Sequence, residues 1–117
     1  MQAIVARPLP HTSSEITFED DYPPMAPSEG NRRLLWLYDQ VSRDLGFGAV
    51  TATDPRDAGA ADVSFTAGPV GRALDGVGLK GEGGHTVRET ADLRMLPIQA
   101  KRAAVLLHRL AQRDPAR

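Results

Sequence analysis

The stretch from Ser28 to Gly46, SEGNRRLLWLYDQVSRDLG, decides the fold of this chain. Ser28 is a favoured N-cap residue, and an acid at Glu29 suits the positive end of a helix dipole. Apolar side chains then recur at helical spacing, at Leu34, Leu35, Tyr38, Val41 and Leu45. Gly46 is a typical residue at the end of a helix. The stretch therefore predicts an amphipathic helix whose apolar face needs a partner surface.

A second long helix is predicted over residues 91–113, ADLRMLPIQAKRAAVLLHRLAQR. Pro97 suits its first turn, where a backbone N–H has no helical partner to lose. The apolar stripe of this helix comprises Ala100, Ala103, Leu106, Leu107 and Leu110. Its polar side carries basic residues that a solvated face explains fully, namely Lys101, Arg102, Arg109 and Arg113.

Shorter segments of the chain have the pattern of β-strands. In SSEITFED, residues 13–20, Ile16 and Phe18 alternate with polar residues and fall on one face. The other predicted strands are residues 1–7, 49–53 (AVTAT) and 72–79 (RALDGVGL). Strands that alternate with helices predict an α/β layer. Two strands between the helices are too few for a stable open sheet, so we expect part of the sheet to be missing.

A proline-rich segment, DYPPMAPSEGN (residues 21–31), separates the first strands from the first long helix. It has three prolines in five residues, and proline fixes φ and removes a backbone donor. This segment is predicted to be a stiff, extended linker and a domain boundary. The expected organisation is therefore a terminal piece over residues 1–27 and a second unit over residues 28–117.

Composition limits the classes of function. The chain has 117 residues, of which 41% are hydrophobic and 25% charged, as in a soluble globular protein of at most one ordinary domain. A net charge of -1 predicts no general attraction to nucleic acid or to an anionic membrane. With no cysteine, disulfides and thiolate metal sites are excluded. No apolar run approaches the roughly 20 residues of a membrane span, and a cytoplasmic location is expected.

The stretch KGEGGHTVRET, residues 80–90, contains the best chemical candidate. Three glycines in four residues precede His85, which indicates unusual backbone dihedrals or a close approach by another group. His85 is either a metal ligand or general base presented on a loop, or a loop histidine that caps a helix or faces solvent. Glu89 either orients the imidazole or begins the terminal helix.

Other polar residues carry weaker signals. Asp62, within GAADVSFTAG, caps the segment that follows it or lines a site. His11 lies beside prolines and His108 lies on the terminal helix, and both are predicted to be surface residues. GEGG lacks the lysine and the Ser or Thr that follow the glycines of a P-loop, so nucleotide binding is not predicted.

Taken together, four segments resemble the C-terminal part of the zinc-dependent aminoacylase and carboxypeptidase family, which includes glutamate carboxypeptidase, acetylornithine deacetylase and succinyl-diaminopimelate desuccinylase. EITFEDDYPPMAPSEGN resembles the last strand of the family's α+β lid domain and its exit. GAADVSFTA resembles a small-residue segment with an aspartate near the site. DGVGLKGEGGHTVRETADL resembles the loop that delivers the last metal-binding histidine, with an H-T-x-x-E step. LPIQAKRAAVLLHRL resembles the closing helix.

The resemblance implies a mixed sheet with flanking helices and a catalytic centre of two zinc ions, with cobalt or manganese as alternatives. It implies that His85 is a metal ligand, and that Gly83, Gly84, Thr86, Glu89 and Asp62 support the site or the substrate loop. The family's H-x-D ligands, bridging aspartate and paired glutamates have no counterpart here. The resemblance thus implies an incomplete hydrolase of peptides or N-acyl amino acids, inactive alone.

A second class of function is a stand-alone, non-catalytic α/β module that binds a protein partner. In either case, two amphipathic helices without a wide sheet predict exposed apolar surface and self-association.

Overall fold

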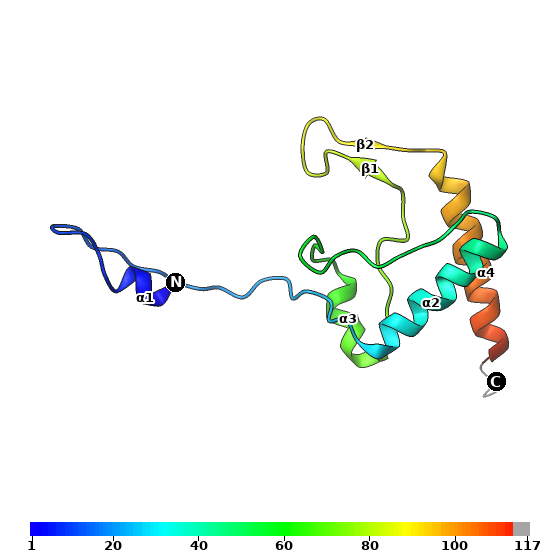
Figure 1. The fold of residues 1–117 in the computed structure, drawn as a ribbon, viewed down its shortest axis with the longest axis horizontal. Coiled ribbons are helices and arrows are strands. Elements are labelled where there is room, and N and C mark those ends of the chain that lie inside the picture. The colour runs from blue at the N-terminus through cyan, green and yellow to red at the C-terminus, as the bar shows by residue number, and fades with distance from the viewer. Residues whose placement is uncertain (114–117) are drawn as a thin grey trace.

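The computed structural model describes residues 1–113 (Figure 1). Its elements in chain order are α1 (Gln2–Val5), α2 (Glu29–Asp44), α3 (Val63–Val70), β1 (Gly81–Glu82), β2 (Thr90–Ala91) and α4 (Met95–Arg113). The two long helices, α2 and α4, pack against each other, and β1 and β2 form a small hairpin beside them. None of the described helices combines the length and the apolar character that a membrane crossing requires.

The predicted helix after Ser28 is confirmed as α2. The Ser28 side chain accepts a hydrogen bond from the Asn31 backbone N–H at 3.1 Å, as an N-cap does. At the other end Gly46 has a φ of +77°, which a residue with a side chain rarely adopts. Local chemistry at both ends therefore sets the limits of this helix.

The core lies between α2 and α4. Tyr38, Val41 and Leu106 are its buried centre. Half-buried apolar residues surround them, namely Leu34, Leu37, Leu45, Val50, Leu74, Val105 and Leu110. Of the stripe predicted on the terminal helix, Ala100 and Leu107 instead face solvent. Helix pairing across one narrow seam is therefore the main source of apolar burial in this chain.

The segment that follows α2 turns back along the same helix. The Ser42 hydroxyl donates to the Gly48 carbonyl at 2.6 Å, and the Val50 N–H donates to the Asp39 carboxylate at 2.8 Å. A side chain of α2 thus takes the backbone donor that a strand ladder would need. The strand predicted over residues 49–53 is wrong for this reason.

The segment over residues 72–79 is held in the same manner. Asn31 accepts from the Ala73 N–H at 2.7 Å, and Gln99 donates to the Gly78 carbonyl at 2.8 Å. This segment makes hydrogen bonds to both long helices but belongs to no strand, so that prediction is also wrong. Gly30 permits the approach, since a Cβ there would lie 2.0 Å from the Gly71 carbonyl oxygen.

Residues 1–27 form an arm that projects from the helix pair (Figure 1). The strands predicted over residues 1–7 and 13–20 are wrong, because Gln2–Val5 is helical and residues 13–20 lie outside any helix or strand. An extended segment becomes a strand only when a neighbour pairs with its backbone, and β1–β2 is the single ladder in the described part of the chain. Arg32 donates to the Pro27 carbonyl at 2.7 Å and anchors the end of the arm.

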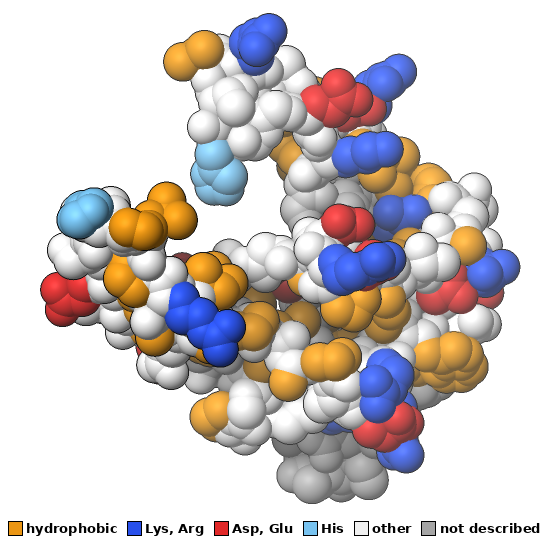
Figure 2. Space-filling view, turned by 60° about the vertical axis from the view of Figure 1, so that its left-hand side comes forward, with side chains coloured by type: hydrophobic (Ala, Val, Ile, Leu, Met, Phe, Trp, Pro, Cys, Tyr) orange, Lys and Arg blue, Asp and Glu red, His pale blue; other side chains and the backbone are white. Residues whose placement is uncertain are grey.

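The chain is open for its size. Its radius of gyration is 20.0 Å, against roughly 13 Å for a compact domain of this length. Its accessible surface is 9793 Å², against about 6,200 Å² for a compact monomer of 12.6 kDa. Figure 2 shows hydrophobic side chains exposed in several separate patches on the face in view. The exposed apolar surface expected from the sequence is therefore present.

The basic side of α4 differs from the prediction at Arg102. This residue is only 7% exposed, because Phe47 in the segment after α2 lies against it. Its guanidinium donates to Gln99 at 3.0 Å and to the Phe47 carbonyl at 3.3 Å, and it lies over the Phe47 ring. Lys101 is exposed as predicted, Arg109 pairs with Asp44 at 2.8 Å, and the Arg113 side chain lies outside the described residues.

Tyr38 joins this buried polar cluster, and it predicts an alkaline limit to stability. Its hydroxyl donates to Gln99 at 2.8 Å, and burial raises the pKa of Tyr38 above the usual 10.0, outweighing the lowering effect of Arg102. The folded state retains the phenol proton more strongly than the unfolded state. The contribution of protonated Tyr38 to stability is therefore complete below pH 10 and is lost as pH rises through the higher folded-state pKa. Denaturant unfolding measured from about pH 9 to about pH 12 should show that the unfolding free energy falls less steeply with pH in Tyr38→Phe than in the unmodified chain. Equal slopes in both proteins would contradict this assignment.

Candidate functional site

The β1–β2 hairpin carries the predicted loop histidine. Its strands are antiparallel, with Gly81 opposite Ala91 and Glu82 opposite Thr90. A Cβ at Gly81 would lie 1.9 Å from the Thr90 carbonyl oxygen, so only glycine permits this close pairing. The first glycine of the run before His85 is thus explained by strand pairing, not by a ligand.

Consecutive tight turns build the tip of the hairpin. Gly83 has a φ of +66°, and its carbonyl accepts from the Thr86 N–H at 3.1 Å and from the Thr86 hydroxyl at 2.7 Å. The Glu89 N–H then donates to the Thr86 carbonyl at 3.1 Å. Thr86 and Gly83 therefore fix the backbone on either side of His85.

His85 lies at this tip with a φ of 62°, in the left-handed region that residues with a side chain rarely occupy. The conformation costs about 1 kcal/mol or more and persists where the surrounding structure enforces it. The side chain is exposed, and the hydrogen bonds among the described residues do not include its imidazole. His85 therefore faces solvent on a loop, as one of the sequence-based alternatives has it, and it does not cap a helix.

The structure also places the other residues that the sequence analysis assigned to the site, namely Glu89, Gly84 and Asp62. Glu89 is exposed and precedes β2, so the alternative that it begins the terminal helix is wrong, since α4 begins at Met95. No atom lies within 4 Å of a Cβ built at Gly84, which leaves this position open to an approaching group. Asp62 occupies the N-cap position of α3 but makes no side-chain cap bond.

Asp62 instead contacts the arm. It accepts a hydrogen bond from the Tyr22 hydroxyl at 3.3 Å, and the Tyr22 ring packs edge-on against Phe65 with centroids 5.0 Å apart. Forty positions separate Tyr22 from Asp62, so sequence spacing offered no signal for this contact. The structure does not bring Asp62 and His85 into any described contact.

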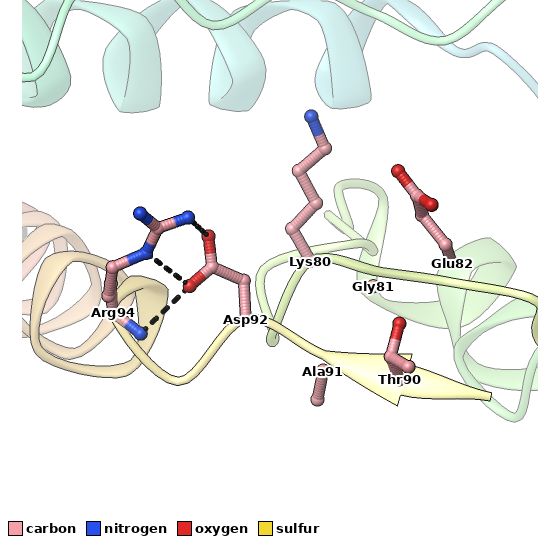
Figure 3. Close-up of a pocket in the computed structure, with 7 residues that line it drawn as sticks. All are labelled: Lys80, Gly81, Glu82, Thr90, Ala91, Asp92 and Arg94. Carbon is pink, nitrogen blue, oxygen red and sulfur yellow. Dashed lines mark hydrogen bonds and ion pairs between the residues drawn. The ribbon is translucent and has the colours of Figure 1, made fainter.

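A shallow hollow of about 460 Å³ lies at the base of the hairpin (Figure 3). Lys80, Gly81, Glu82, Thr90, Ala91, Asp92 and Arg94 line it. Arg94 binds both carboxylate oxygens of Asp92 at 2.8 Å, and these hydrogen bonds lower the pKa of Asp92. Asp92 also accepts from the Arg94 backbone N–H at 3.1 Å, just before α4 begins. Sequence reasoning missed this acid, and its role here is to order the entry to α4.

The described residues contain no cluster of three or more histidine and acidic side chains that would hold a metal ion. An exposed imidazole at a rigid turn is chemically suited to be one metal ligand, but zinc sites generally need at least three protein ligands. His85 therefore fits a metal site only if other ligands come from outside the part of the chain described here.

Comparisons with protein-family models, curated proteins and solved structures give no match to this chain. The residues of the hairpin and the order of segments along the sequence therefore carry the functional inference.

Proposed function

We propose that this chain is the C-terminal portion of a metal-dependent hydrolase of the amidohydrolase or carboxypeptidase type. The observation that carries the proposal is the placement of His85 at the tip of a hairpin, in a left-handed backbone conformation held by turns on both sides. Such strained positions cluster at functional sites. The family-like order of segments around the hairpin supports the same proposal.

In this proposal His85 supplies one neutral imidazole ligand to a zinc centre, for which cobalt or manganese would also serve. The metal would polarise an amide carbonyl and activate water, and a peptide or an N-acyl amino acid would be the substrate. The H-x-D ligands, the bridging aspartate and the paired glutamates would come from a segment outside this sequence. A cytoplasmic location belongs to the same proposal.

The other hairpin residues would position His85. Thr86 and Gly83 hold the turn through their mutual hydrogen bonds, and Gly84 leaves space for substrate or metal to approach the backbone. We assign Glu89 as the carboxylate that would orient the imidazole, and Asp62 as a residue near the substrate side of the site. The α/β character of the complete domain, with a wider mixed sheet, is part of this proposal.

The second candidate is a partner-binding module, and one observation favours it. The outward side of α4 is apolar and has no partner among the described residues, with Leu107 66% exposed. A neighbouring reading frame that encodes an H-x-D motif and paired glutamates would favour the hydrolase. A folded, monodisperse 117-residue protein that binds no metal would favour the module.

The chain by itself is expected to bind zinc weakly and to hydrolyse nothing. One imidazole supplies one of the ligands that a zinc ion needs, and no residue here matches the family's glutamate base. Isothermal titration of zinc should give no tight stoichiometric site and the same trace for His85→Ala, and dipeptides and N-acyl amino acids should stay intact. Two metal ions bound at micromolar affinity with turnover would show that Asp62, Glu82 or Glu89 act as ligands.

A further inference from the structure

Helix α4 has two apolar faces, of which only one packs on α2. The packed face includes Val105, Leu106 and Leu110. The second face, which we call the outer stripe, consists of Leu96, Ala100, Ala103, Ala104, Leu107 and Ala111. These residues recur at steps of three and four and so lie along one side of the helix. Leu96 is 57% exposed and Leu107 66% exposed, whereas a lone surface helix would have polar residues there.

The outer stripe has a large apolar side chain near each end and small ones between them. Leu96 and Leu107 stand eleven positions apart, which is about 16 Å along a helix axis. The residues of the stripe between them are alanines, whose methyl groups form a low floor. A stripe of this length has room for two apolar side chains of an extended segment, which are about 7 Å apart at positions i and i+2.

The arm contains such a segment. Ile16 and Phe18 alternate with polar residues, and Phe18 is 61% exposed. The segment is also acidic, with Glu15, Glu19, Asp20 and Asp21 and no lysine or arginine between positions 8 and 31. Its backbone takes part in no ladder, so it is free to lie along another surface. We call residues 12–21 the acidic arm.

The charges of the two surfaces are opposite. Helix α4 contains no acidic residue, and of its basic side chains Lys101 is exposed, whereas Arg102 is buried and Arg109 is paired with Asp44. Lys101 is exposed, and its position on the helix borders the outer stripe on one side. Opposite charges beside an apolar contact favour encounter and fix register. The acidic arm thus matches the outer stripe in apolar spacing and in sign of charge.

We infer that the acidic arm of one copy docks on the outer stripe of α4 in a second copy. Tyr22 fastens the end of the arm to Asp62 and Phe65, and from there the arm extends away from α4 of its own chain (Figure 1). A second copy brings its own arm to the first in return, so a two-fold dimer contains the contact twice. This inference goes beyond the proposed hydrolase and does not depend on it.

Sedimentation equilibrium of the full chain tests the inference. We expect a dimer at micromolar concentration, with a dissociation constant that rises when sodium chloride is increased, because the acidic and basic groups are exposed. Leu107→Glu and Phe18→Ser should each raise the dissociation constant at least about tenfold, since each removes an apolar group from the contact. Both side chains are more than half exposed, so circular dichroism should show the same helix content in each variant.

Val87→Ser is the matched control, because Val87 is fully exposed on the hairpin turn and outside both surfaces. It should leave the dimer intact. Mixing the Phe18→Ser and Leu107→Glu chains should restore association in part, because the intact arm of one chain can dock on the intact stripe of the other and form one of the two contacts. A monomer at all concentrations would overturn the inference, and so would a dimer that survives Phe18→Ser, which would indicate packing of stripe against stripe.

Discussion

Replacing His85 by alanine is expected to lower activity about a thousandfold or more in a protein that joins this chain to the segment with the remaining metal ligands. The alanine has no nitrogen to coordinate a metal, so one ligand of the proposed centre would be lost. The fold should survive, because the imidazole is exposed and makes none of the described hydrogen bonds. The measurement is kcat/KM on an N-acyl amino acid, together with the zinc content of each purified variant.

The other two histidines provide controls for this prediction. His11 lies in the arm with a φ of 65°, and His108 is exposed on α4, where its ring lies 3.1 Å from the Gln112 amide nitrogen. His11→Ala and His108→Ala should change kcat/KM little and leave the zinc content unchanged. If all three alanine variants kept the same activity and metal content, His85 would not be a ligand. Loss of the fold in His85→Ala would instead assign it a structural role.

The long helices were predictable because their signals are local. The Ser28 cap, the apolar spacing and Gly46 all lie within the helix α2 or next to it. The strand predictions failed because a strand depends on a distant partner, and the sequence does not show whether the partner exists. Val50 and Ala73 donate their N–H groups to the side chains of Asp39 and Asn31 instead.

The candidate site was predictable in part for the same reason. The glycines around His85 indicate unusual dihedrals, and Gly83 and His85 itself adopt positive φ values. The contacts of Tyr22 with Asp62 and of Arg102 with Phe47 join residues 40 and 55 positions apart. A helical wheel places Arg102 on the polar side, but it does not include the segment after α2 that covers this residue.

Truncation of Leu106 to alanine is expected to lower the free energy of unfolding by roughly 2–4 kcal/mol. Leu106 is 8% exposed and packs with Tyr38 and Val41 at the centre of the α2–α4 seam. Its loss leaves a cavity in a core that has few other members, because the open chain buries little apolar surface elsewhere. Urea unfolding in dilute, high-salt solution, where the chain is monomeric, measures this cost.

Leu107→Ala is the matched control, since the same residue type stands one position further along the same helix. Leu107 is 66% exposed, so its truncation should change the unfolding free energy by no more than about 0.5 kcal/mol in the monomer. At concentrations where the proposed dimer forms, the difference between the stability losses of Leu106→Ala and Leu107→Ala should become smaller. Leu107 is then part of a contact, so its truncation costs more. Equal costs in the monomer would contradict the pairing of α2 with this face of α4. The same pair of variants thus separates the face that folds the chain from the face that is open to a second copy.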